Sequence, residues 1–196
     1  MKCLLLILSL LTYELHAQAD VRGLGNYLIG ATTPDSLKKT DFEEEQALVK
    51  GTIALPCTHI RVFKATTIDI SGILVSDLFL YFYDNVLFKL SCTYTDTLNT
   101  AFVLKHGEGK SLPRISVQYC VRREDKLMLI GRRIWQKGDF AAVLIQAEGY
   151  NASCRLEEVD RLTISSQRIL ALASDCELPN PYPFMEEFDS RLNERL

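Results

Sequence analysis

Two glycine-rich segments of the chain look at first like phosphate-binding loops. Gly107-Glu108-Gly109-Lys110-Ser111 ends like a nucleotide-binding loop, but that loop requires glycine at position 104, where the chain has Leu104. The loop must also open a helix, whereas Pro113 opens a predicted strand. The segment Gly23-Leu24-Gly25 lacks the third glycine of a dinucleotide fingerprint, because Leu28 stands there. Neither segment predicts nucleotide binding, and no cofactor is expected.

Hydrolysis by a serine or cysteine nucleophile requires a histidine base, and only His59 and His106 lie beyond the first 19 residues. His106 is expected in the last turn of a helix, where a charged imidazole interacts favourably with the helix dipole. His59 follows Cys57 by two residues on a predicted strand, and nothing in the sequence orients it as a base. No G-x-S-x-G segment occurs, and no metal site is predicted. A hydrolase whose site is assembled only by the fold, from carboxylates or His59, remains an alternative.

One segment of the chain is basic. Between residues 122 and 137, six cations stand against two acids, a local charge of +4 in a chain whose total is −3. The only tryptophan lies in the same predicted hairpin, and arginine and tryptophan are frequent at interface hot spots. The hairpin is therefore either a partner-binding surface or a solvated sheet face with the tryptophan in the core. The candidate partner-binding residues are Arg122, Arg123, Lys126, Arg132, Arg133, Trp135 and Lys137.

The first 19 residues have the features of an export signal. Met1-Lys2 is a short positive start, Cys3 to Leu11 is an apolar run, and Ala17-Gln18-Ala19 matches a cleavage site. A run of this length is too short to cross a hydrocarbon core, which needs about 20 helical residues. The sequence predicts a signal peptide at 1–19, an exported protein that is periplasmic or extracellular, and no transmembrane segment after cleavage.

Five cysteines follow the predicted signal peptide, an odd number in a compartment that permits disulfides. Cys120 and Cys154 bracket a predicted antiparallel meander, and their pairing is the preferred bridge. Such a bridge would stabilise the fold by roughly 3–4 kcal/mol in the loop-entropy model. Cys92 lies on the apolar face of a predicted strand, where a buried thiol and a bridge to Cys57 remain equally open.

The remaining pattern indicates strands with a few short helices. Residues 78–83 and 86–94 form the clearest hairpin, since Asp84-Asn85 tolerates the positive φ of a tight turn. A helix is expected from a cap at Thr95 or Asp96 to Gly107. Further strands are expected at 115–121, 127–135 and 140–147, a short helix at 33–37, a helix or loop at 41–50, a strand or helix at 162–172, and an amphipathic helix at 183–196.

Runs of strands with few helices imply an α+β fold, mainly an antiparallel sheet of about 6–8 strands with short helices packed on one face. The composition, 47% hydrophobic and 24% charged, excludes a disordered chain. Nucleic acid is not an expected partner, because 22 Lys and Arg stand against 25 Asp and Glu. Residues 20–196 are expected to form a single domain.

Three segments together resemble a known layout: Phe82-Tyr83-Asp84-Asn85-Val86-Leu87-Phe88-Lys89-Leu90, then Leu104-Lys105-His106-Gly107, then Trp135-Gln136-Lys137-Gly138-Asp139. A hairpin, a short helix ending in K-x-G and a W-x-x-G-D turn are similar to uncharacterised exported α+β proteins of Bacteroidetes-type bacteria, over about residues 78–147. This resemblance implies a periplasmic or envelope setting and transfers no catalytic residues.

Since no coherent active site emerges, the sequence favours an exported, soluble, non-catalytic domain that binds a protein or a cell-envelope component. The binding surface would be the sheet face or the basic hairpin at 122–137. An inhibitor of an exported hydrolase is a special case of this function, and a hydrolase is the alternative from a different class.

Overall fold

The computed structural model describes residues 20–45, 55–121 and 125–173, together with Cys176, Leu178 and Tyr182. The predicted signal peptide at 1–19 and the predicted helix at 183–196 lie outside these residues. The described part is mostly antiparallel sheet with two short helices, which confirms the α+β class. It contains no helix with the length and apolar character needed to cross a membrane.

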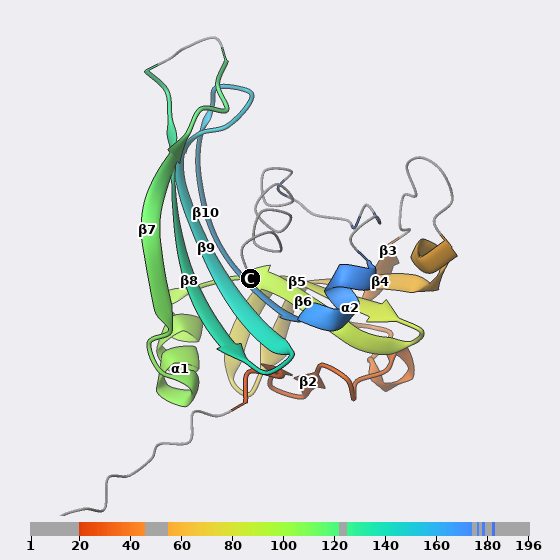
Figure 1. Ribbon diagram of the computed structural model, residues 1–196. Helices are drawn as coiled ribbons and strands as arrows, with labels where there is room; N and C mark the ends of the chain where they lie inside the picture. Colours follow the sequence, from red (N-terminus) through yellow and green to blue (C-terminus); the bar gives the residue numbers. More distant parts are fainter. Residues whose placement is uncertain are drawn as a thin grey trace, which may run out of the picture.

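One large sheet organises the molecule, with the strand order β3-β4-β5-β6-β10-β9-β8-β7. Two four-stranded meanders, β3–β6 and β7–β10, meet at the antiparallel pair of β6 and β10. The sheet bends sharply, so that β7–β10 rises as a curved arm above the other half (Figure 1). The strands are β3 (Glu43–Glu45), β4 (Ile60–Ile70), β5 (Ile73–Tyr83), β6 (Val86–Thr93), β7 (Lys110–Val117), β8 (Met128–Lys137), β9 (Phe140–Tyr150) and β10 (Leu156–Ser166).

A helix follows each meander: α1 (Asp96–His106) after β6, and α2 (Gln167–Leu172) after β10. The helices pack on opposite faces of the sheet rather than on one, because α1 contacts the cluster that contains Leu80 and α2 the cluster that contains Phe79. Neighbouring residues of a strand point to opposite faces. We call the face under α1 the outer face and the face under α2 the inner face.

The expected hairpins are present. Asp84 and Asn85 join β5 to β6 with φ of 49° and 62°, and Gly138 turns β8 into β9 with φ of 60°. Both turns use residues that accept positive φ, as the sequence predicted. Residues 33–37 contain the expected short helix, the 3-10 turn η1 (Pro34–Ser36); a second 3-10 turn, η2 (Leu55–His59), precedes β4.

Helix α1 begins and ends where the sequence predicts. The Thr95 hydroxyl accepts a hydrogen bond from the Leu98 nitrogen at 3.3 Å, and Gly107 follows the last turn with φ of 77°. His106 is 1% exposed and its ring lies 4.5 Å from that of Phe102. His106 lies in the last turn of the helix, as the sequence predicted, and the spacing of four residues puts it on the same buried face as Phe102.

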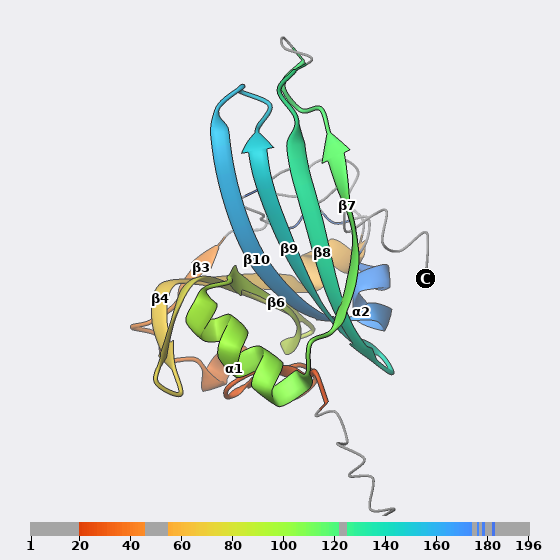
Figure 2. The same cartoon turned by 90° about the vertical axis from the view of Figure 1, so that its left-hand side faces the viewer.

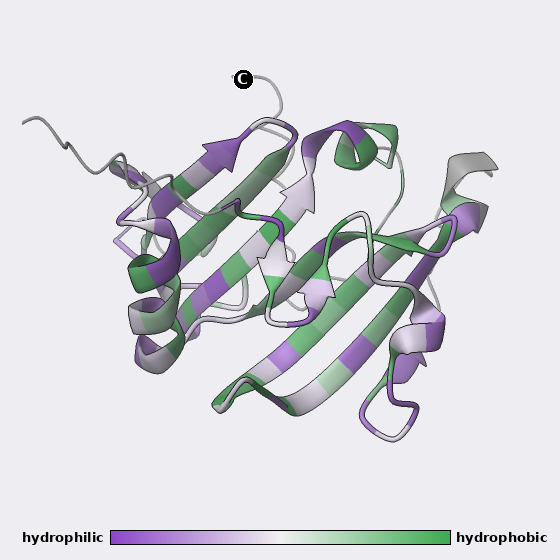
Figure 3. Cartoon of the chain, turned by 90° about the horizontal axis from the view of Figure 1, so that it is seen from below, coloured by the Kyte–Doolittle hydropathy of each residue, from purple (hydrophilic) through white to green (hydrophobic). Residues whose placement is uncertain are grey.

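The outer face of the β3–β6 half is covered by α1 and by the N-terminal segment, which includes the small ribbon β1 (Gly23–Leu24) and β2 (Tyr27–Leu28). Seen from below, apolar and polar residues alternate along the strands (Figure 3). The core here includes residues from both meanders and α1, among them Leu24, Leu80, Phe82, Leu90, Leu98, Phe102, Trp135, Leu144 and Leu162.

On the inner face, α2 packs against β4, β5 and β6. The carboxylate of Asp139, in the β8–β9 turn, accepts a hydrogen bond from the Arg168 nitrogen at 2.8 Å and so caps this short helix. Beyond the helix, Leu178 packs on the same inner cluster and Tyr182 on a second cluster formed by β8–β10. These described positions place the chain after α2 on the inner face.

Two disulfides are present. One is the preferred pair, and the other joins Cys57 to a different cysteine from the one considered in the sequence analysis. Cys120 is bonded to Cys154, the preferred pair. Cys57 is bonded to Cys176, so the proposed bridge between Cys57 and Cys92 is wrong. Cys92 is a buried free thiol, the other interpretation of its apolar strand position.

Two expectations about elements need correction. Glu43–Glu45 is a strand rather than a helix or loop, because the segment pairs with the edge of β4 and Glu44 accepts two hydrogen bonds from the Arg61 guanidinium, at 2.7 and 2.9 Å. Those bonds hold the pKa of Glu44 below its usual value. Residues 162–172 are a strand followed by a helix, since β10 continues to Ser166. The Ser166 hydroxyl caps α2 by accepting a hydrogen bond from the Ile169 nitrogen.

Candidate functional site

The residues of the predicted basic hairpin are spread over both faces of the arm. Arg132 and Arg133 are consecutive on β8, so their side chains leave opposite faces. The register places Arg132 beside Ile145 of the inner-face core and Arg133 beside Leu144 of the outer-face core. Both arginines are partly buried, and Arg133 lies 3.6 Å from Glu108. They cannot contact one partner surface together.

Trp135 belongs to the core. Its side chain is 1% exposed, its Nε1 donates to the Gly107 carbonyl oxygen at 2.7 Å, and its ring meets Phe102 edge-on at 5.0 Å between centroids. Gly109 passes so close that a Cβ there would lie 2.5 Å from the indole, and its φ of 69° also favours glycine. Trp135 therefore joins the end of α1 to the base of the arm, and the core interpretation is confirmed.

The two lysines of the hairpin lie at opposite ends of β8. The Lys126 ammonium is 4.3 Å from the centre of the Tyr150 ring, near the tip of the arm. Lys137 is exposed at the far end of β8. A strand of 10 residues spans about 30 Å, so these cations do not share a surface. Arg122 and Arg123 lie outside the described residues.

The upper outer face of the arm exposes apolar side chains. Leu129 pairs with Glu148, and Tyr150 pairs with Leu156, so alternation puts Leu129, Tyr150 and Leu156 on one face. Leu127 precedes Leu129 by two residues, in the same phase. Leu127, Leu129 and Leu156 are 41%, 44% and 73% exposed. We call these four residues, Leu127, Leu129, Tyr150 and Leu156, the tip cluster.

The view of the outer side explains this exposure. Helix α1 lies across the base of the arm, and above it the strands rise with no helix in front of them (Figure 2). Lower on the same face, Leu144 and Leu162 are 2% and 0% exposed within the core that includes α1. The change from buried to exposed leucines along one face therefore follows the upper limit of the helix.

Covalent and backbone contacts hold the tip in place. The Cys120–Cys154 disulfide joins the chain just beyond β7 to the β9–β10 turn. The Asn151 side chain in that turn accepts from the nitrogens of Ser153 and Arg155, each at 3.0 Å. The Tyr150 nitrogen donates to the Leu127 carbonyl oxygen at 3.2 Å. A surface fixed in this way loses little conformational entropy when a partner binds.

Carboxylates surround the tip cluster. Glu148 and Glu158 are exposed and pair across β9 and β10 on the outer face. One step lower, the Gln146 amide lies 3.4 Å from an Asp160 carboxylate oxygen. Burial raises the pKa of Asp160, while the hydrogen bond from Gln146 lowers it. The described outer face near the tip cluster thus carries these carboxylates together with two cations, Lys126 over the Tyr150 ring and Arg114 beside Gly131.

The tip cluster was not predicted, although the sequence contains a signal for it. Residues 127–130 form an uninterrupted apolar run, which in a strand makes both faces apolar. Met128 and Ile130 are fully buried on the inner face, and Leu127 and Leu129 are the outward members of the run. A strand that is apolar on both faces is usually covered by other elements on both faces. The exposed leucines of this run therefore indicate a face that is available for contact.

His59 has an acidic neighbour but no nucleophile in Cys57. Its Nδ1 lies 2.5 Å from an Asp84 carboxylate oxygen, and its ring stacks on Tyr83 at 5.9 Å between centroids. The side chains of His59 and Asp84 are 51% and 61% exposed, so the pair stands in solvent. Cys57 is bonded to Cys176 and has no thiolate to offer. Within the described ranges, no three His, Cys, Asp or Glu side chains gather closely enough to hold a metal ion.

A buried arginine lies where the two halves of the sheet meet, and the sequence analysis did not single it out. Arg161 is 1% exposed; its Nε donates to the Ser91 hydroxyl at 2.8 Å and its NH2 to the Asp77 carbonyl oxygen at 3.2 Å. Burial lowers the pKa of Arg161. These contacts link β10 to β6 and β5, and the side chain serves the fold.

Comparison with known proteins gives no further guide, since no protein family, curated protein or solved structure matches the chain. The candidate site therefore rests on geometry alone. That geometry favours the tip cluster over both the dispersed basic hairpin and the exposed pair of His59 and Asp84.

Proposed function

We propose that the protein is an exported, non-catalytic binding domain that contacts a protein partner through the tip cluster. The observation that carries this proposal is the exposure of Leu127, Leu129 and Leu156 on one face of a disulfide-held arm. Contiguous exposed apolar side chains are the usual mark of an interaction surface. Tyr150 adds an aromatic ring of the type enriched in interfaces.

Export is part of the same proposal. The apolar leader at 1–19 and its A-x-A end support it, and the two disulfides are compatible with an oxidising compartment. A protein surface is favoured because charges of both signs accompany the exposed leucines: Glu148 and Glu158 on β9 and β10, and Lys126 over the Tyr150 ring. An exported hydrolase is one class of protein partner, in which case the domain would act as its inhibitor.

A photocrosslinking amino acid in place of Leu129 tests this contact directly in the source cells. The expected result is one dominant adduct with another protein, reduced at least tenfold when Leu156→Asp is combined with it. The matched control carries the crosslinker in place of Leu104, which is 89% exposed on α1 and therefore more accessible than Leu129. The same adducts from both positions, or none from position 129, would rule out the tip cluster as the contact.

A further inference from the structure

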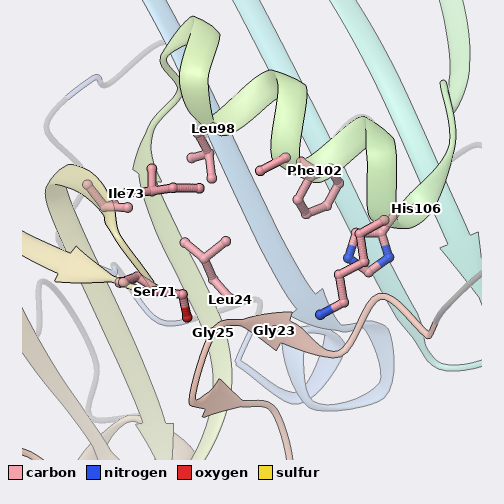
Figure 4. Close-up of a pocket in the computed structure, with 12 residues that line it drawn as sticks. Gly23, Leu24, Gly25, Ser71, Ile73, Leu98, Phe102 and His106 are labelled. Carbon is pink, nitrogen blue, oxygen red and sulfur yellow. The ribbon is translucent and has the colours of Figure 1, made fainter.

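A pocket of about 200 Å³ lies under α1, away from the tip cluster. It is lined by the helix, by the N-terminal ribbon and by the β4–β5 turn, and it is partly open to solvent. Leu98 and Phe102 reach from the helix toward Leu24 of the ribbon, while Ser71 and His106 lie at opposite ends (Figure 4). The walls are thus mainly apolar, with polar atoms at the ends.

The ribbon side of this pocket is fixed by two glycines. A Cβ at Gly25 would lie 2.2 Å from the Ile70 side chain, and a Cβ at Gly23 would lie 2.0 Å from the Tyr27 carbonyl oxygen. The backbone therefore approaches its neighbours more closely than any other residue would allow. Because the opposite wall is a capped helix, the pocket is formed before any ligand arrives.

The volume limits the size of a ligand. An apolar cavity of roughly 150 Å³ in another protein accepts benzene. The pocket under α1 is slightly larger, and so has room for one ring or a branched chain with a short polar substituent. Sites for drug-sized molecules usually occupy about 300–1,000 Å³, so this pocket would hold only part of a ligand of that size.

The charge of the residues that line the pocket indicates which polar group a ligand would carry. Lys105 lines the pocket, and no aspartate or glutamate is among the lining residues. A ligand with a negative group would therefore find one ammonium and no opposing carboxylate. Lysine is a mobile point charge on a flexible stem, which suits a carboxylate at the mouth of an apolar site.

We propose that this pocket binds a small apolar monocarboxylate, with its hydrocarbon part between Leu98, Phe102 and Leu24 and its carboxylate near Lys105. No chemical step is involved. The site is independent of the tip cluster, which lies on the upper part of the arm, so the domain would have a small-molecule site in addition to its protein contact.

Phenylacetate is a suitable probe, compared with the neutral 2-phenylethanol and the cationic 2-phenylethylamine. The expected dissociation constant of phenylacetate is of order 1 mM, as for other ligands of this size. Backbone amide resonances of α1 and the ribbon should shift on titration. We expect phenylacetate to bind about two- to fivefold more tightly than the alcohol, and the amine more weakly than both.

Two variants separate the apolar and the charged parts of the site. Ala101→Leu fills the pocket from α1 and should weaken all three probes at least tenfold. Lys105→Met should remove the preference for phenylacetate over the alcohol, whereas Lys110→Met, an exposed lysine at the start of β7, should leave it unchanged. Circular dichroism and thermal unfolding establish that each variant is folded.

Three results would overturn the proposal: no shifts around the pocket with any probe at 10-fold the expected dissociation constant, unchanged binding in Ala101→Leu, or an intact carboxylate preference in Lys105→Met. The variant Leu129→Asp/Leu156→Asp should bind phenylacetate normally. The two proposals can therefore fail separately: loss of the protein contact at the tip cluster would not contradict ligand binding in the pocket, and loss of ligand binding would not contradict the protein contact.

Discussion

The middle of the β3–β6 half of the sheet is packed on both faces, whereas the arm formed by β7–β10 leaves the upper part of its outer face open. In β5, five consecutive residues from Leu78 to Phe82 are at most 5% exposed. In β8, Met128 is fully buried while the adjacent Leu129 is 44% exposed. The two halves share a four-stranded meander followed by a helix, so topology does not decide which half has a free face. The position of α1 at the base of the arm decides it.

Removal of the two disulfides should give the largest changes in unfolding free energy among the variants that compare the two halves. Cys57 and Cys176 are 119 residues apart, and Cys120 and Cys154 are 34 apart. Loop-closure entropy predicts a loss of about 5 kcal/mol in unfolding free energy for Cys57→Ser/Cys176→Ser and about 4 kcal/mol for Cys120→Ser/Cys154→Ser. Urea unfolding under oxidising conditions measures both. A greater loss from the shorter loop would mean that the arm contributes more to global stability than its open face suggests.

At the base of the arm, Trp135→Ala removes the contact between the arm and α1. We expect a loss of about 3–5 kcal/mol, because a fully buried large side chain leaves a cavity. Trp135→Phe keeps most of the packing but removes the hydrogen bond to Gly107, and should cost about 1 kcal/mol beyond the lost volume. A loss below about 1 kcal/mol for Trp135→Ala would place the indole outside the core, contrary to its burial.

Cys92 lies on β6 at the junction of the two halves, where burial raises the pKa of its thiol to about 12 and Arg161 partly opposes the shift. Between pH 9, the ordinary thiol pKa, and about pH 12, the Cys92 thiol stays protonated in the native state but is deprotonated in the unfolded chain. Unfolding free energy should therefore fall as the pH rises from about 9 toward 12. Cys92→Ala should show a shallower fall. Burial raises the pKa of Tyr94 to about 12 as well, with a smaller contribution from the charge of Cys92, so the larger part of the Tyr94 effect is common to both proteins.

Parallel slopes for the wild type and Cys92→Ala would contradict the buried thiol. A second measurement is independent of pH. Cys92 should be alkylated by iodoacetamide only after unfolding in denaturant, since the side chain is 0% exposed.

The smallest effect is expected at the tip. Leu129→Asp and Leu156→Asp should each lower unfolding free energy by no more than about 1 kcal/mol, because both side chains already contact solvent and the carboxylate at position 129 adds only repulsion from Glu148 on the paired strand. Leu144→Asp, on the same outer face but 2% exposed, should prevent stable folding, since it buries an unpaired carboxylate. Thermal unfolding of the three variants compares the open and covered parts of this face. Strong destabilisation by Leu129→Asp would show that the tip is packed.

Local chemistry made much of the fold predictable. The hairpin at Asp84-Asn85 and the limits of α1 at Thr95 and Gly107 follow from turn and cap preferences, which act over a few residues. The Cys120–Cys154 pairing followed from the predicted meander that it brackets. Each of these features depends on residues close in sequence or on one simple element.

Features created by distant packing were not predictable. Glu43–Glu45 has little intrinsic preference for a strand and becomes one only by pairing with β4. The orientation of Arg132 and Arg133 toward opposite faces is implicit in their adjacency, but the burial of Trp135 depends on where α1 packs. The tip cluster is exposed because no helix packs over it, and the place where α1 packs cannot be deduced from any single segment of the sequence.

The cap that Asp139 provides to α2 has a consequence for the order of assembly. A helix of six residues does not form alone in water, and besides its local cap at Ser166 this one receives a second capping bond from a turn 29 residues earlier in the chain. Stable docking of α2, which leads the chain toward Cys176, therefore depends on the hairpin of β8 and β9 as well as on the local cap. Oxidation of Cys57 and Cys176 should be the last covalent step of maturation, and an enzyme that isomerises disulfides would act mainly on chains in which Cys176 has paired too early.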